Sequence, residues 1–247
     1  HQEHRSYTLS NQRVKLNINQ YLEKQKIYCK NIYMMWPTLC VDNFLDNPDD
    51  VVDEALKGTY QLDDEGRSPG KRCFNLINLN RHLTKKIVNC IFPHEAQDND
   101  FNAKVSTSFQ LIDSSYNGKG WVHNDAGHEM TALIYLSKNL TQCGTSLYKP
   151  KNFASKIEDV KIKKDFYLGK NPKGYQEALE KNHSNFVETA YFDSIYNRLI
   201  VFDSSHMHGV KNFNISKENP RLTFICFFNQ FFGPSLKSGI VQSKRSI

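Results

Sequence analysis

Two short stretches of this 247-residue chain carry side chains that could bind one metal ion. His123 and Asp125 are two residues apart, and side chains at that spacing on an extended strand point to the same side. A second imidazole from a neighbouring strand would complete a set of two histidines and one carboxylate. Such a set leaves half of an octahedral coordination sphere open, which allows Fe(II) to take a cosubstrate and O₂. The spacing therefore predicts a mononuclear iron site.

Two histidines further along the chain compete for the third position. His206 and His208 both follow the apolar run 199–202, which predicts a buried strand that breaks just before them. Either imidazole could face the ion while the other lines the site or the surface, and the residue types do not separate them. The alternative for His123 and Asp125 is an ordinary hydrogen-bonded pair on the surface, without an ion.

A candidate anion-binding pair opens the last apolar run. Arg221 and Thr223 share one face of the predicted strand, because they are two residues apart. A guanidinium and a hydroxyl together suit the far carboxylate of a dicarboxylic acid. The alternative for Arg221 is a surface salt bridge at the start of a strand. Beside a metal site we favour the carboxylate-binding interpretation.

The front of the chain is predicted to supply helices. Asn47 as N-cap, Pro48 at the first helical position and acids in the first turn predict a helix over 47–56. The spacing of apolar residues predicts a second helix over 81–89. We expect a first strand within 33–45, and a loop over 63–72 because of its glycine and proline. The polar segment 21–28 is a candidate short helix or edge strand.

From residue 104 onward the pattern of apolar residues changes from one typical of helices to one typical of strands. Short runs rich in β-branched and aromatic residues are separated by glycine, asparagine and serine, which predicts a sandwich on which the helices pack. These runs cover residues 106–113, 131–136, 146–148, 199–202 and 222–228.

The length and the 39% hydrophobic content predict one domain over 1–247. We divide it into a support over 33–100 and a core over 104–232. The lysine-rich insertion 150–194, with a helix expected over 174–181, is long for a bare connection, so we expect a lid or a substrate-facing segment.

Charge and cysteine usage narrow the partners and the compartment. The formal net charge of +6 could favour an anionic substrate, but no arginine-aromatic interleaving supports nucleic-acid binding. The six cysteines form no CxxC motif and have apolar flanks, which indicates reduced, buried thiols in a cytoplasmic protein. No apolar run approaches the length of a bilayer span, so we expect no membrane partner.

Residues 109–229 resemble the 2-oxoglutarate/Fe(II)-dependent oxygenases, and among them the prolyl 4-hydroxylase-like branch that includes oxygen-sensing enzymes and small enzymes of bacteria and phages. The motifs that carry the resemblance occur in the order of that family. They are His123-Asn124-Asp125, Tyr135-Leu136-Ser137, Gly144-Thr145-Ser146-Leu147-Tyr148, Asn197-Arg198-Leu199, His208-Gly209-Val210 and Arg221-Leu222-Thr223. Two features depart from the family: Cys143-Gly144 replaces a doubled glycine, and the connection from His208 to Arg221 is longer than usual.

The resemblance implies a mostly β fold: a jelly-roll core, also called a double-stranded β-helix, with helices packed on one sheet. It implies an Fe(II)- and 2-oxoglutarate-dependent dioxygenase that hydroxylates a C–H bond, with ascorbate as a supporting reductant. A peptide or protein is the leading substrate class. The same chemistry on a small molecule or nucleic-acid base, and a non-catalytic jelly-roll binding module, stay open as alternatives.

The resemblance also assigns roles to single residues. It implies that His123, Asp125 and His208 are the iron ligands, and it prefers His208 to His206 because His208 stands directly before the x-Val pair. Arg221 and Tyr135 would hold the C5 carboxylate of 2-oxoglutarate. Thr223 is a weaker candidate for the same pocket.

Overall fold

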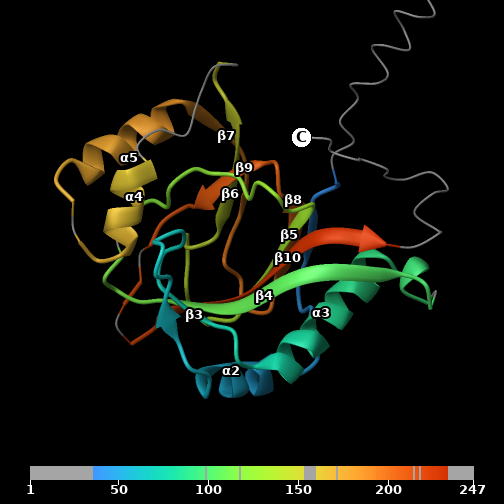
Figure 1. Ribbon diagram of the computed structural model, residues 1–247. Helices are drawn as coiled ribbons and strands as arrows, with labels where there is room; N and C mark the ends of the chain where they lie inside the picture. Colours follow the sequence, from blue (N-terminus) through green and yellow to red (C-terminus); the bar gives the residue numbers. More distant parts are fainter. Residues whose placement is uncertain are drawn as a thin grey trace, which may run out of the picture. The chain divides into compact units, whose positions relative to one another are not determined.

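Two antiparallel sheets form the described part of the chain (Figure 1). The computed structural model describes residues 36–97, 99–116, 118–152, 160–170, 172–213, 215–216 and 218–232. The large sheet has the order β1-β8-β5-β10-β4-β3-β2 and the small sheet the order β7-β6-β9. The strands are β1 (Leu39–Val41), β2 (Gln61–Leu62), β3 (Lys71–Cys73), β4 (Asn102–Ile112), β5 (Met130–Tyr135), β6 (Thr145–Pro150), β7 (Phe186–Phe192), β8 (Leu199–Asp203), β9 (Met207–Val210) and β10 (Arg221–Phe232).

The chain alternates between the two sheets along the core. β4, β5, β8 and β10 lie in the large sheet, whereas β6, β7 and β9 lie in the small one. The segment just before His123 extends the small sheet, because the Gly120 amide donates to the Val210 carbonyl at 2.8 Å. Eight extended segments shared in this way between two sheets form a jelly roll. The fold class predicted from the sequence is therefore confirmed.

Helices cover the face of the large sheet that points away from the small sheet (Figure 1). They are α2 (Pro48–Leu56) and α3 (Ile77–Ile91), and a short 3₁₀ turn, η1 (Glu95–Gln97), follows. Leu83 and Ile87 of α3 are fully buried, as are Phe109 and Phe224 on the paired strands β4 and β10. Burial of these large side chains removes apolar surface from water, which is the main favourable term in folding.

The predicted helices are present with shifted ends. α2 has proline at its start and Asp49 and Asp50 in its first turn as expected, but Asn47 makes no side-chain capping hydrogen bond. α3 begins four residues before the predicted start at Arg81. The helix predicted over 174–181 is α5 (Tyr175–Ser184), and a further helix in the insertion, α4 (Val160–Tyr167), was not predicted.

Other expectations hold only in part. The first strand narrows from 33–45 to β1, and the candidate element at 21–28 lies outside the described residues. Cys73, Cys143 and Cys226 are buried as predicted, whereas Cys40 is exposed, because it lies on the edge strand β1. Within the described residues, no helix combines the length and apolar character needed to cross a membrane.

Candidate metal centre

Three of the predicted side chains come together between the sheets. His123 follows the segment that pairs with β9, Asp125 lies two residues later, and His208 lies on β9 itself. Asp125 Oδ2 is 3.3 Å from His208 Nε2, and Asp125 Oδ1 is 3.7 Å from His123 Nε2. One ligand atom from each residue lies within 4.8 Å of the others. This spacing suits a single ion whose coordination sphere is occupied on one face by two imidazoles and a carboxylate.

Backbone carbonyls fix the orientation of both imidazoles. His123 Nδ1 is 2.9 Å from the Trp121 carbonyl oxygen, and His208 Nδ1 is 2.9 Å from the His206 carbonyl oxygen. A carbonyl can only accept, so each Nδ1 carries the hydrogen and each Nε2 is left as the electron-pair donor. Both Nε2 atoms point toward Asp125, as a metal site requires.

The extended segment just before His123 is held from both sides. On one side it pairs with β9, and on the other the amide side chain of Asn182 on α5 replaces a neighbouring strand. Asn182 Oδ1 accepts from the Val122 amide at 2.9 Å, and Asn182 Nδ2 donates to the Val122 carbonyl at 3.1 Å. Trp121 packs on Ala178 and Leu179 of the same helix. The insertion therefore positions the first ligand, which the sequence did not predict.

A pair of hydroxyl groups orients the carboxylate. Thr131 on β5 donates to Asp125 Oδ2 at 2.7 Å, and its own oxygen lies 2.9 Å from the hydroxyl of Ser204, which follows β8. The backbone of Asp125 is held as well, because its amide donates to the Ser204 carbonyl at 2.9 Å. Thr131 and Ser204 were missed from the sequence, since only the fold brings them beside Asp125.

The electrostatics of the three residues favour a divalent cation. Burial, together with the nearby His208, lowers the pKa of His123 to about 4, so this imidazole is neutral at pH 7. Burial opposes ionisation of Asp125, but His208, His123 and the hydroxyl of Thr131 lower the pKa of its carboxyl well below the usual range. Burial also disfavours charge on His208, but Asp125 outweighs it and raises the pKa of His208. Because an imidazole binds a metal in its deprotonated form, an incoming cation would compete with the proton for His208.

His206 does not join this group. Its amide donates to the Asp203 carbonyl at 3.0 Å in the turn before β9, and its Nδ1 is buried without a hydrogen-bond partner. Only its carbonyl oxygen contacts a member of the group, His208. The structure therefore brings His208, and not His206, to His123 and Asp125.

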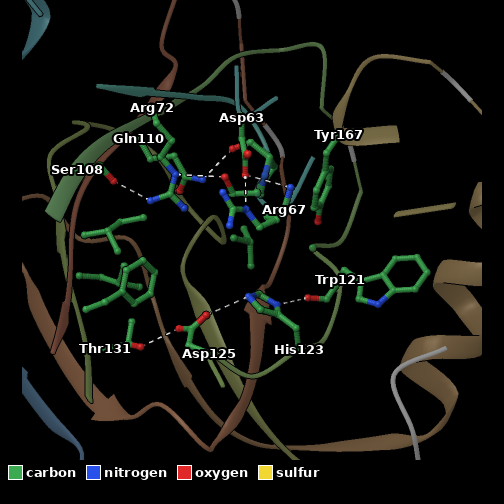
Figure 2. A pocket seen from close by; sticks show the side chains of 18 of the residues that line it. Asp63, Arg67, Arg72, Ser108, Gln110, Trp121, His123, Asp125, Thr131 and Tyr167 are labelled. Carbon is green, nitrogen blue, oxygen red and sulfur yellow. Dashed lines mark hydrogen bonds and ion pairs between the residues drawn. The ribbon is translucent and has the colours of Figure 1, made fainter. Parts of the chain in front are cut away.

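A cavity of about 950 Å³ opens beside the three residues, and Figure 2 shows part of its lining. Arg221 reaches it from the start of β10 and is 2% exposed. Its Nε donates to the Cys143 carbonyl at 2.9 Å, and its Nη1 lies 3.5 Å from the hydroxyl of Thr223. Among the described residues no carboxylate oxygen lies within 4 Å of this guanidinium, which lines the cavity.

Tyr135 and Thr223 are placed behind Arg221 and are not part of the cavity lining. They are directly paired on β5 and β10, and the Arg221 guanidinium lies 5.4 Å from the centre of the Tyr135 ring. The Tyr135 hydroxyl donates to the Thr145 hydroxyl at 2.8 Å, and Thr145 does line the cavity. The Tyr135 ring thus packs against the Arg221 guanidinium, and its hydroxyl binds Thr145, which lines the cavity.

The fold and the site define a jelly-roll protein in which two imidazoles and one carboxylate lie close enough together that they could hold a metal ion. Residues 25–228 match a family of unknown function, DUF6445, and the chain belongs to that family. A comparison with curated proteins finds no match.

Solved structures give distant matches. A prolyl hydroxylase from Trichoplax adhaerens, in complex with a peptide of the hypoxia inducible factor oxygen degradation domain, is 16% identical, with 87% of this chain and 91% of that chain covered at a TM-score of 0.47. A Pseudomonas putida prolyl-4-hydroxylase is 12% identical, with 77% and 91% covered at 0.44. The epimerase SnoN, in complex with Fe3+, alpha ketoglutarate and nogalamycin RO, is 12% identical, with 77% and 78% covered at 0.48. These values are too low to transfer an activity or a residue role.

Proposed function

We propose that this protein is an Fe(II)- and 2-oxoglutarate-dependent oxygenase that hydroxylates a C–H bond. One observation supports the proposal above the others: His123, Asp125 and His208 converge in a cavity that also holds the buried guanidinium of Arg221, which has no carboxylate partner within the described chain. A metal site with three open positions and a separate carboxylate anchor is what a chelating dicarboxylic cosubstrate needs.

Each residue has a task in this proposal. The Nε2 atoms of His123 and His208 and the carboxylate of Asp125 would hold Fe(II), which would use O₂ as the oxidant and 2-oxoglutarate as the co-reductant to supply the chemistry of hydroxylation. Arg221 would bind the far carboxylate of the cosubstrate with the two-pronged geometry that lysine lacks. Thr131 keeps Asp125 Oδ2 engaged, so the rotation of the carboxylate is restricted.

Apolar side chains between these groups limit the access of water. Leu133 and Ile225 line the cavity from the large sheet, and both are buried. In a dry cavity the attraction between Arg221 and a carboxylate is stronger than at the surface, because the effective dielectric constant is lower. The cosubstrate would therefore be held at a defined distance from the metal.

For the substrate, we propose a peptide or protein, in a prolyl 4-hydroxylase-like reaction. The support is the order of the motifs from His123 to Thr223 along the chain.

The test follows binding and consumption of 2-oxoglutarate. Purified protein with Fe(II) is expected to bind 2-oxoglutarate without oxygen, by calorimetry, and to form succinate slowly in air, by NMR. His123→Ala should abolish both, because it removes a ligand, whereas His82→Ala on the exposed face of α3 should change neither. His206→Ala should keep metal binding, because its side chain is outside the group. Absence of both binding and consumption in the wild type would contradict the proposal.

A further inference from the structure

A second guanidinium faces the same cavity. Arg72 lies on β3 directly opposite Gln110 on β4, and Gln110 lies directly opposite Thr223 on β10. Side chains at directly opposed positions of an antiparallel sheet point to the same face. Arg72 therefore points to the face that carries Arg221, and it lines the cavity (Figure 2). In Figure 2 Arg72 and Ser108 lie at one end of the view, and His123 and Asp125 at the other.

The charge of Arg72 is not matched by a carboxylate. Its Nη1 donates to the Ser108 hydroxyl at 2.8 Å and its Nε to the Ser68 hydroxyl at 3.3 Å, and both partners are neutral. No carboxylate oxygen in the part of the chain that the structure describes lies within 4 Å of its nitrogens. A guanidinium has five N–H groups, so these two bonds leave donors for a ligand.

The nearby carboxylate of Asp63 is engaged elsewhere. Its two oxygens accept from the amides of Glu65 at 3.1 Å and Arg67 at 3.0 Å, and the side chain of Arg67 lies 3.6 Å away. Burial lowers the pKa of Arg72 to about 10, although Asp125 and Asp63 act in the opposite direction, and the group stays charged at pH 7. A partly buried guanidinium without a carboxylate in direct contact is costly, and an entering anion would relieve that cost.

A third cation borders the cavity from the insertion. Lys163 on α4 is partly buried and lines it. The loop before β3 packs on the same helix: a Cβ atom added to Gly66 would lie 2.5 Å from the Lys164 carbonyl oxygen. The loop and the helix therefore close one side of the cavity together. The helix contributes Lys163, and Arg72 lies on β3 just after the loop.

Arg72 and Arg221 reach the cavity from different strands of the large sheet. They lie on β3 and β10, two strand spacings apart with β4 between them, or about 10 Å between backbones. In the proposed function both carboxylates of 2-oxoglutarate are already used, one at the metal and one at Arg221. An acid group at Arg72 must then belong to another molecule.

We propose that Arg72, assisted by Lys163, binds a carboxylate of the substrate. The substrate class is thus an acid with an apolar body, such as an acidic peptide segment or a small carboxylic acid. The apolar part is accommodated by the half-exposed Leu62, the exposed Phe74 and the partly buried Phe227, which line the same cavity. This inference rests on the proposed function, because it assigns Arg221 to the cosubstrate.

The test uses hippurate, an aromatic acid, and hippuramide, its neutral amide, as probes. Protein loaded with Zn²⁺ and saturated with 2-oxoglutarate is titrated with each by calorimetry. Hippurate is expected to bind at least about tenfold more tightly than hippuramide, since hydrogen bonds to charged groups are the stronger kind. Arg72→Gln should remove that preference and leave 2-oxoglutarate affinity within about threefold, whereas Arg221→Gln should lose 2-oxoglutarate. Arg81→Gln, the same charge change on the exposed face of α3, should alter neither.

The outcomes separate the two proposals. Failure of the wild type to bind 2-oxoglutarate contradicts the proposed function. The substrate inference is overturned if the wild type binds 2-oxoglutarate but not hippurate, if Arg72→Gln binds hippurate as the wild type does, or if Arg72→Gln loses 2-oxoglutarate as Arg221→Gln does. If Arg72→Gln does not fold, Arg72→Lys decides: a several-fold loss of hippurate affinity supports the inference, and unchanged affinity overturns it.

Discussion

The main chains of His123 and His208 hydrogen-bond to each other reciprocally, with amide-to-carbonyl distances of 2.9 Å from His123 and 2.7 Å from His208. Such directly opposed residues carry their side chains on one face, and the two imidazole centroids are 4.5 Å apart. A single backbone pair thus places both imidazoles beside Asp125. The register of this pair, and not the residue type, distinguishes His208 from His206.

The hydroxyl of Thr131 should strengthen metal binding without touching the metal. Thr131→Val removes the hydrogen bond to Asp125 Oδ2 and keeps the shape of the side chain. We expect affinity for Zn²⁺ to fall about tenfold or more, because the carboxylate is then free to rotate. Competition for Zn²⁺ with a chromophoric chelator measures this affinity in the variant and in the wild type.

Thr189→Val is the matched control for that change. The Thr189 hydroxyl on β7 donates to the Leu147 carbonyl and not to a metal-site residue. Both variants lose one hydroxyl, but Thr131 is buried and Thr189 is exposed, so the unfolding free energy of each variant is measured alongside its Zn²⁺ affinity. Equal Zn²⁺ affinities in Thr131→Val and the wild type would show that Asp125 needs no such support.

The ion pair between Asp42 and Arg198 should make stability depend on pH. Arg198 donates to both carboxylate oxygens, and this hydrogen bonding lowers the pKa of Asp42 despite slight burial. A lowered pKa means that the stabilisation is fully present above the unfolded pKa of about 3.9 and is lost as pH falls through the lower pKa of the folded state. Because Asp42 is half exposed, we expect Asp42→Asn to lower the unfolding free energy by at most about 1 kcal/mol at pH 7 and by less at pH 3.

Urea denaturation of the two proteins at pH 7 and pH 3 measures this difference. A surface pair is screened by salt, so the difference at pH 7 should also shrink in 1 M NaCl. A difference that persists unchanged at pH 3 would show that Asp42 stabilises the fold by something other than its charge.

Local sequence patterns were sufficient for the parts of the site that lie close together in the chain. The two-residue spacing of His123 and Asp125, and the strand before His208, identified two segments whose three side chains do meet. The pattern could not select between His206 and His208, because period 2 places both on one face. That choice depends on where β9 begins, and it begins after His206.

Residues brought in by long-range pairing could not be found in this way. Arg72 lies in a segment read as a loop, because β3 is three residues long and is defined by its pairing with β4 far along the chain. Thr131 lies in a strand that was predicted, but its contact with Asp125 depends on the turn between them. The helix α4 was missed because it is short and lysine-rich.

The surroundings of Gly144, just before β6, show why Cys143 can replace the first residue of a doubled glycine. A Cβ atom there would lie 1.9 Å from the Phe192 carbonyl oxygen and 2.7 Å from the Asp193 Cα, and both are backbone atoms that cannot move aside. The preceding position tolerates a side chain, since Cys143 is buried there. Only the second of the two positions therefore requires glycine.

Gly144→Ala should consequently destabilise the fold by about 3 kcal/mol, at the upper end of overpacking costs, and should shift Thr145 beside the cavity. Gly169→Ala is the comparison, because Gly169 has a φ of 76° but open space around its Cα. That variant should lose only about 1 kcal/mol, the cost of a left-handed conformation. Urea denaturation measures the unfolding free energy of both variants. Equal losses would mean that β6 and β7 can separate at this point without cost.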